Sequence, residues 1–253
     1  MKSRLGIGLF YLLLLLLWQY TASRQWVPSY IFPTPLLVAE RLGELGGDGS
    51  LWPSVRQTLT RMVAGFCLSA TIGLALGLVM GTSKLINGCL RSLLLGLQTL
   101  PSAAWVPISL LIFGLNDRGI YFVIIMSSMA AMAIATADGI VQIPPLYLRA
   151  ARTLGAPWYA LGYRVILPAA LPNIITGIKL GWTLGWHGAV SAELIKSTMG
   201  LGFLLHMGRE LNDAAQVFGV MLLTITMGLL LDRFLFGLVE ARIRQQWGLA
   251  ASE

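Results

Sequence analysis

The sequence is poor in the residues on which soluble and catalytic proteins depend. Only 11% of its 253 residues are charged, whereas 56% are hydrophobic, and the mean hydropathy is +0.74. Ordinary soluble domains do not have this composition, which indicates a chain that folds in a lipid bilayer. The two cysteines, Cys67 and Cys89, cannot build a framework of several disulfides and have no metal-ligand spacing. We expect both to be small, buried side chains.

The sequence also lacks any segment that would hydrolyse ATP. No stretch matches G-x-x-x-x-G-K-S/T, the loop that cradles nucleotide phosphates, and neither a soluble domain nor an internal repeat is visible. The net charge is +7, but the 18 Lys and Arg residues are scattered between apolar segments and form no basic stripe, which argues against nucleic acid as a partner. We therefore expect no catalytic residue, no metal site and no cofactor on this chain.

What the sequence does contain is a series of apolar segments long enough to cross about 30 Å of hydrocarbon. These segments predict an all-α membrane protein with about six transmembrane helices. The expected spans are Leu5–Tyr20, Met62–Met80, Leu93–Leu115, Gly119–Val141, Ile174–Leu194 and Ala214–Val239. The chain 1–253 then forms a single transmembrane domain, with the first span in 1–25, an extracytoplasmic segment in 26–56, core helices in 57–245 and a cytoplasmic loop in 144–172.

Six spans place both termini on one side of the membrane, and the distribution of Lys and Arg indicates that this side is the cytoplasm. It would carry the larger share of the cations, among them Lys2, Arg4, Arg242 and Arg244, with Lys179 and Arg233 able to snorkel toward it. The first segment allows a second interpretation, because two cations before a Leu-rich run also resemble a cleavable signal peptide. The later loops keep their sides under either interpretation.

The segment between the first two spans combines three prolines, Pro28, Pro33 and Pro35, with the amphipathic run Leu36–Leu45 and several glycines after it. Prolines and glycines interrupt regular structure, whereas the run between them has the spacing of a helix with one apolar face. We expect one short helix that lies along the extracytoplasmic surface.

Two spans carry rows of small residues spaced four apart, which let another helix backbone approach closely. These rows are Gly65, Ser69, Gly73, Gly77 and Gly81 in the second span, and Gly177, Gly181, Gly185 and Ala189 in the fifth. We interpret Gly73, Gly77, Gly81, Gly181 and Gly185 as helix-packing residues. A surface that slides during gating is the alternative, and the rows alone identify no function.

Polar residues in the third and fifth spans are candidates for lining a pathway. Pro101 and Pro107 predict a kinked third span whose freed carbonyls need partners. His187 lies near the middle of the fifth span, where an imidazole must face protein or a water-filled cavity. A kink that serves packing and a satisfied core histidine are the alternatives. The pathway candidates are Gln98, Ser102, His187 and Glu193.

The most distinctive stretch is the loop between the fourth and fifth spans, which has prolines at both ends. Tyr147–Leu154 has helical spacing, Gly155 permits a sharp turn, and Pro157 can begin a second short helix that ends before Pro168. The loop combines a flat surface that a partner can approach with large side chains of the kind that anchor an interface. The flat part is Ala150 and Ala151, and the anchors are Arg149, Arg152, Trp158 and Tyr159.

This loop resembles that of the permease subunits of binding-protein-dependent ABC importers, particularly the sulfonate, taurine and nitrate group. Their motif is Glu-Ala-Ala, then Gly, then Leu-Pro, and it matches Arg149-Ala150-Ala151, Gly155 and Leu167-Pro168. Further likeness over about residues 30 to 245 comes from Phe32-Pro33-Thr34-Pro35, Pro101 to Pro107 and Ala192-Glu193 to Gly202. The chain departs from the family at Arg149, which stands where Glu is usual.

The resemblance implies that the loop is a coupling helix that docks into a groove on a separate ATPase subunit. The residues it assigns to coupling are Arg149, Ala150, Ala151, Arg152, Gly155, Ala156 and Pro168. It also implies a second copy of the permease, two ATP-binding subunits that hold ATP and Mg, and an extracytoplasmic substrate-binding protein, all at the bacterial inner membrane. The implied cargo is a small anion such as a sulfonate, nitrate or bicarbonate, moved by alternating access. An ion-coupled secondary transporter is the alternative, although its usual internal repeat is not apparent.

Overall fold

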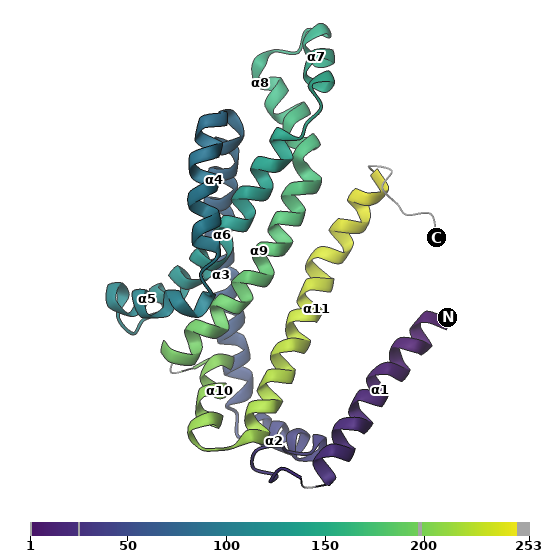
Figure 1. Ribbon diagram of the computed structural model, residues 1–253, viewed down its shortest axis with the longest axis vertical. Helices are drawn as coiled ribbons and strands as arrows, with labels where there is room; N and C mark the ends of the chain where they lie inside the picture. Colours follow the sequence, from purple (N-terminus) through teal and green to yellow (C-terminus); the bar gives the residue numbers. More distant parts are fainter. Residues whose placement is uncertain (1, 25, 197–198, 247–253) are drawn as a thin grey trace. The chain divides into compact units, whose positions relative to one another are not determined.

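The computed structural model describes residues 2–24, 26–196 and 199–246, and within this part the regular elements are all helical (Figure 1). They are α1 Lys2–Ser23, α2 Pro35–Gly47, α3 Leu51–Thr82, α4 Lys84–Gln98, η1 Ser102–Ala104, α5 Trp105–Phe113, α6 Asp117–Val141, α7 Pro145–Thr153, α8 Trp158–Leu161, η2 Gly162–Ile166, α9 Leu167–Lys196, α10 Leu201–Glu210 and α11 Ala214–Gln246. The side chains of Lys2, Arg4, Trp158, Arg242 and Arg244 lie outside the described part. The predicted all-α membrane fold is confirmed.

Four helices are long and apolar enough to cross a membrane: Leu51–Thr82, Asp117–Val141, Tyr159–Ile195 and Ala214–Gly237. A fifth crossing arises if α4 and the helical stretch Ser102–Phe113 are counted as one span, although they are bent by 91°. The first apolar segment forms a shorter helix over Gly8–Ser23. The count of six spans therefore stays a prediction.

The third span, expected over Leu93–Leu115 with a kink, is broken into two helices instead of bent within one. Helix α4 begins at Lys84 and ends at Gln98, and the chain then turns sharply at Pro101, which has extended backbone angles of φ −62° and ψ 146°. Proline lacks an N–H and disfavours the helical conformation of the residue before it, so a helix readily ends here. The proline indicated the site of the bend but not that the helix stops.

The chain divides into two compact units, which are described separately. The first unit comprises Met1–Thr58 and Glu193–Met227. Its apolar core contains Leu45, Leu51, Leu201, Leu204 and Val220. Helix α2 confirms the predicted short amphipathic helix: Thr34 caps its start, and Val38 and Leu45 are its buried residues. Helix α3 begins at Leu51, within the segment 26–56 that was expected to be extracytoplasmic.

The second unit comprises Leu59–Ala192 and Gly228–Glu253, and α6 is its central helix. Of the most apolar stretch of α6, 56% is buried, against 28% or less for the other three long helices. Helices α4 and α5 both pack against α6. Figure 1 shows α7 beyond the end of α6, at one extremity of this unit.

Both rows of small residues face α6. A Cβ atom on Gly77 would lie 2.6 Å from the carbonyl oxygen of Ala133, and one on Gly181 would lie 2.3 Å from the methyl carbon of Met132. Gly65, Gly73 and Gly81 from α3 and Gly177 from α9 make similar approaches to α6, whereas a Cβ added to Gly185 would lie nearest to Met62 of α3, at 3.1 Å. The rows thus allow α3 and α9 to pack closely on α6.

The expectation that both cysteines are buried is wrong, because Cys67 and Cys89 are exposed and free. Cys67 follows Gly65 by two residues, which corresponds to about 200° around a helix. Since the glycine row of α3 occupies the face toward α6, Cys67 lies on the opposite face.

Candidate coupling loop and translocation pathway

Helix α7 ends in a complete Schellman turn. Gly155 has φ +77°, a conformation that costs glycine little. Its N–H donates to the carbonyl oxygen of Arg152 at 2.9 Å, and the N–H of Ala156 donates to that of Ala151 at 3.0 Å. These two bonds satisfy carbonyls that the end of a helix leaves open. The glycine of the loop motif therefore has a local structural cause, and the predicted helix and turn are both present.

The second half of the loop differs from the expected short helix that ends before Pro168. Helix α8 continues through the π-helical turn η2 into α9, and Tyr159–Ile195 forms one helical stretch of 37 residues. The ring of Pro168 would clash with the carbonyl of Arg164 in a regular α-helix, and a wider turn relieves this clash. The helix therefore passes the proline instead of stopping at it.

The loop presents most of its proposed coupling residues to the outside. Arg149, Ala150, Arg152, Gly155 and Pro168 are exposed, whereas Ala151 and Ala156 are half-buried. Leu154, next to the turn, is 87% exposed. A leucine so fully exposed at the extremity of a unit is typical of a surface that a partner covers.

The break after α4 opens a cavity of about 310 Å³ in the second unit. It brings together three of the four pathway candidates, Gln98, Ser102 and His187, with Ser127 of α6 also in its wall. The Ser102 and Ser191 hydroxyl oxygens lie 3.3 Å apart, which links the broken segment to α9. The cavity thus combines hydroxyl, amide and imidazole groups beside backbone that no longer forms a helix, the arrangement expected of a polar pathway in a membrane.

Glu193 is not in this cavity. It belongs to the first unit and is fully buried, and its Oε2 accepts hydrogen bonds from the Thr58 hydroxyl at 2.7 Å and the Gly202 N–H at 3.2 Å. The same Thr58 oxygen accepts from the N–H of Leu201 at 2.8 Å. A carboxylate here satisfies the free N–H groups at the start of α10 and suits the positive end of that helix. The structure thus assigns Glu193 to the anchoring of α10 and not to the lining of this cavity.

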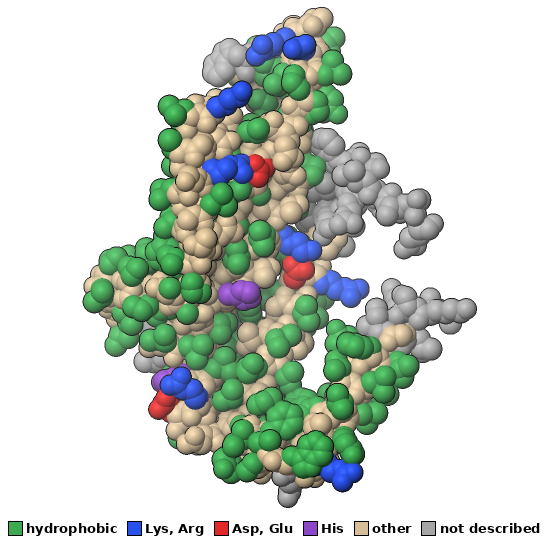
Figure 2. All heavy atoms as spheres, in the orientation of Figure 1, with side chains coloured by type: hydrophobic (Ala, Val, Ile, Leu, Met, Phe, Trp, Pro, Cys, Tyr) green, Lys and Arg blue, Asp and Glu red, His purple; other side chains and the backbone are tan. Residues whose placement is uncertain are grey.

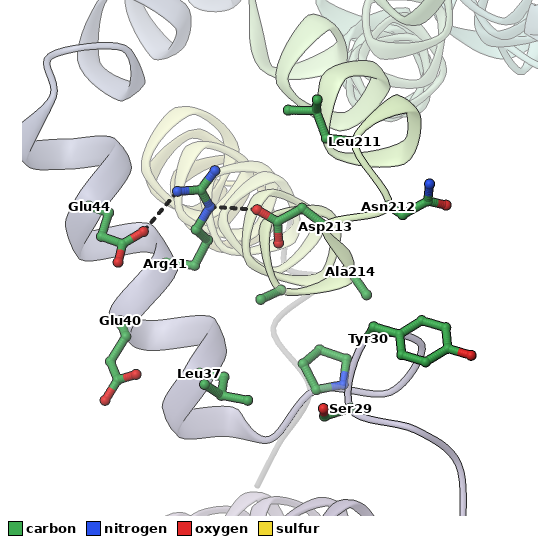
Figure 3. Close-up of a pocket in the computed structure, with 12 residues that line it drawn as sticks. Ser29, Tyr30, Leu37, Glu40, Arg41, Glu44, Leu211, Asn212, Asp213 and Ala214 are labelled. Atoms are coloured by element: carbon green, nitrogen blue, oxygen red, sulfur yellow. Dashed lines mark hydrogen bonds and ion pairs between the residues drawn. The ribbon is translucent and has the colours of Figure 1, made fainter.

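A second hollow, of about 410 Å³, lies in the first unit between α2 and the turn after α10 (Figure 3). Arg41 is at its centre, with Nη1 2.8 Å from Glu44 Oε2 and Nε 2.6 Å from Asp213 Oδ2. The hydrogen bond to Glu44, and then the charge of Asp213, raise the pKa of Arg41. This ion-pair network joins two segments that are far apart in the sequence, and for that reason no sequence motif predicts it.

Ion pairs within the second unit were also missing from the sequence-based interpretation. Arg61 Nη2 lies 2.7 Å from Asp117 Oδ1, and Lys179 Nζ lies 3.7 Å from Asp232 Oδ2. A third pair joins Arg91 to Asp138. An isolated acid inside an apolar segment, such as Asp138 or Asp232, was the available signal, because a charge at that depth needs a partner. In the described ranges no cluster of three His, Cys, Asp or Glu side chains could hold a metal ion.

Comparisons with a family model and with individual proteins both match this chain to membrane components of transport systems. A family model described as binding-protein-dependent transport system inner membrane component matches residues 70–245. The chain is 31% identical over 202 residues to the taurine transport system permease protein TauC of Escherichia coli strain K12, covering 78% of this chain and 74% of that protein. It is 34% identical over 213 residues to the bicarbonate transport system permease protein CmpB of Synechococcus elongatus, covering 80% and 76%.

Among solved structures, a chain of the MetNI methionine ABC transporter in an inward-facing conformation has a similar fold. The TM-score is 0.59 at 19% sequence identity, and the match covers 76% of this chain and 97% of that chain. At this level of identity the likeness concerns the arrangement of the helices alone.

Proposed function

The chain belongs to the inner membrane components of binding-protein-dependent transport systems, and on this premise we propose that it forms the pathway for a small anionic solute in an ATP-driven importer. It is a multi-pass permease subunit. This family membership rules out the alternative interpretation, an ion-coupled secondary transporter. Transport would proceed by alternating access, with the substrate path facing each side of the membrane in turn.

The observation that carries the proposal is the exposed loop from α7 to Gly155, held in shape by its Schellman turn. A rigid helix that ends at an exposed leucine suits insertion into a groove on another protein. We assign that groove to a separate ATP-binding subunit, which would hold ATP and Mg and hydrolyse the nucleotide. In this proposal Arg149, Ala150, Arg152 and Leu154 make the contact, and no covalent chemistry takes place on the permease.

The cavity beside the broken span supports the pathway part of the proposal. Gln98, Ser102 and His187 can each donate a hydrogen bond to the oxygens of an anion, and hydrogen bonds to charged groups are the stronger ones. The relatives named for taurine and bicarbonate are named for solutes that carry an anionic group. A sulfonate, nitrate or bicarbonate is therefore the class of cargo that we propose.

The proposed assembly contains a second copy of the permease, two ATP-binding subunits and an extracytoplasmic substrate-binding protein. The coupling loop must then lie in the cytoplasm, which is compatible with cytoplasmic termini. Fusing a reporter that is active only outside the cytoplasm to the C-terminus tests this placement. An active reporter there would contradict it.

Reconstitution with the co-encoded ATPase tests the function directly. Proteoliposomes that contain the permease, the ATPase and the binding protein should take up one member of a panel of labelled sulfonates, nitrate and bicarbonate when ATP is supplied. The matched control carries an ATPase whose phosphate-loop lysine is replaced, so that it does not hydrolyse ATP. Uptake that persists with this control would falsify the importer assignment.

The two histidines of the chain offer a matched test of the pathway. We expect His187→Ala to lower uptake about tenfold or more, because a hydrogen bond to a charged group contributes about 1.5–3 kcal/mol. His206→Ala, in α10 and away from the lining of this cavity, should leave uptake unchanged. Equal uptake by the two variants would remove His187 from the pathway.

A further inference from the structure

The coupling loop, and the helix after it as far as Glu193, contain no acidic residue. Asp138 and Glu193 are consecutive acids in the sequence, so every charged side chain between them is a cation. Within the loop these cations are Arg149, Arg152 and Arg164, and all three are exposed. Figure 2 shows Lys and Arg side chains gathered at the α7 end of the second unit, with no Asp or Glu among them on that face. The loop thus presents charge of one sign only.

These cations border an apolar strip. Leu146, Ala150 and Leu154 follow one another at four-residue intervals, so they lie on one face of α7, and all three are exposed. Arg149 directly precedes Ala150 and flanks the strip at its middle. A strip of apolar side chains with charge at its edge has the anatomy of a protein interface, with an apolar centre and a polar rim.

We infer that the groove which receives α7 on the ATP-binding subunit is lined by carboxylates. This inference rests on the docking role proposed above and adds the charge of the partner's surface. Placing the Arg149 guanidinium at the rim of the contact against basic groups would be unfavourable, because like charges repel across an interface. Since the family's motif has Glu where this chain has Arg149, the charge presented to the groove is reversed here.

The reversed charge also selects among partners. A groove with basic residues, suited to Glu, would repel Arg149 and Arg152 together, and such like-charge contacts suppress incorrect pairing. The permease should therefore couple to its own ATPase and reject one whose groove is basic. An anionic membrane surface is another acidic partner for exposed arginines, and the experiment below separates it from a protein groove.

Binding measurements on the full-length permease in nanodiscs of zwitterionic lipid test the charge of the groove. Arg149→Gln and Arg152→Gln should each weaken binding of the cognate ATPase about two- to fivefold, as loss of an exposed ion pair of up to about 1 kcal/mol implies. Arg149→Glu should weaken it further, and added salt should weaken wild type more than either variant. Arg118→Gln, exposed in the first turn of α6, is the matched control and should bind as wild type does.

A variant of the apolar strip distinguishes failure of this inference from failure of the docking role. Leu154→Asp changes a side chain that is 87% exposed, so the fold should tolerate it, but it places a carboxylate at the centre of the contact. If Leu154→Asp weakens binding and the arginine variants do not, docking stands and the acidic groove is refuted. If neither changes binding, both proposals fall.

Charge reversal on the partner completes the test. Replacing a carboxylate of the ATPase groove by lysine should restore binding to Arg149→Glu and weaken binding to wild type. Absence of rescue at every groove carboxylate refutes the inference. Arginine effects that appear only in nanodiscs of anionic lipid would assign these side chains to the membrane surface and refute it as well.

Discussion

Replacing Gly77 by alanine tests how closely α3 approaches α6. The added Cβ would lie 2.5 Å from Cβ of Thr136 and 2.6 Å from the carbonyl oxygen of Ala133. Neither atom can move by rotation of a side chain, so the two helices must separate. Overpacking of this kind costs about 1–3 kcal/mol, while the better helix propensity of alanine returns about 0.5–1 kcal/mol. We expect a net loss of roughly 1–2 kcal/mol.

Gly88→Ala in α4 is the matched control, because no other group lies within 4 Å of its added Cβ. It should be neutral or stabilise the protein by about 0.4–1 kcal/mol. The assay is the Tm of the purified protein in detergent, followed by intrinsic fluorescence. A loss of 1 kcal/mol corresponds to about 2–4 °C in a chain of this length. Equal Tm values for the two variants would refute the close contact between α3 and α6.

Two further predictions concern the first unit. Gly200→Ala should destabilise it by roughly 2–4 kcal/mol, because φ is +139° and the added Cβ would lie 2.5 Å from the Glu193 carboxylate. The control is Gly43→Ala, whose added Cβ has no other group within 4 Å. Equal Tm values for the two variants would contradict the prediction. The hydroxyl and N–H of Ser50 lower the pKa of the Asp48 carboxyl from its ordinary 3.8, so this group stabilises the folded state above pH 3.8 and the contribution is lost as the pH falls through the lower folded value. Asp48→Asn should therefore reduce the fall in Tm on acidification. A Tm that falls with pH as steeply in the variant as in the wild type would contradict this prediction.

The local features of the coupling loop could be predicted from the sequence, because their causes lie within a few residues. Pro144 and Pro145 at the start of α7 favour its initiation, and Gly155 allows the left-handed turn that ends it. The continuation into α9 was missed, since a proline normally ends a helix and the π-turn that accommodates Pro168 has no clear sequence signal. Similarly, Pro101 marked a bend, but the direction of α5 after it depends on packing against α6.

The contacts that join distant segments could not be predicted in the same way. Glu193 was expected to line the pathway, and the hydrogen bond from Thr58 that places it elsewhere exists only after the chain has folded. The pair of Arg41 and Asp213 likewise joins α2 to the turn before α11. By contrast, Gln98 and His187 do share a cavity, because polarity within an apolar span limits where such a side chain can lie.

The unbroken helical stretch Tyr159–Ile195 has a mechanical consequence. It begins at the coupling loop and carries His187 about 28 residues later, which at about 1.5 Å per residue is roughly 40 Å away. Because the helical stretch is continuous between them, a displacement of the loop is passed along it to the wall of the cavity.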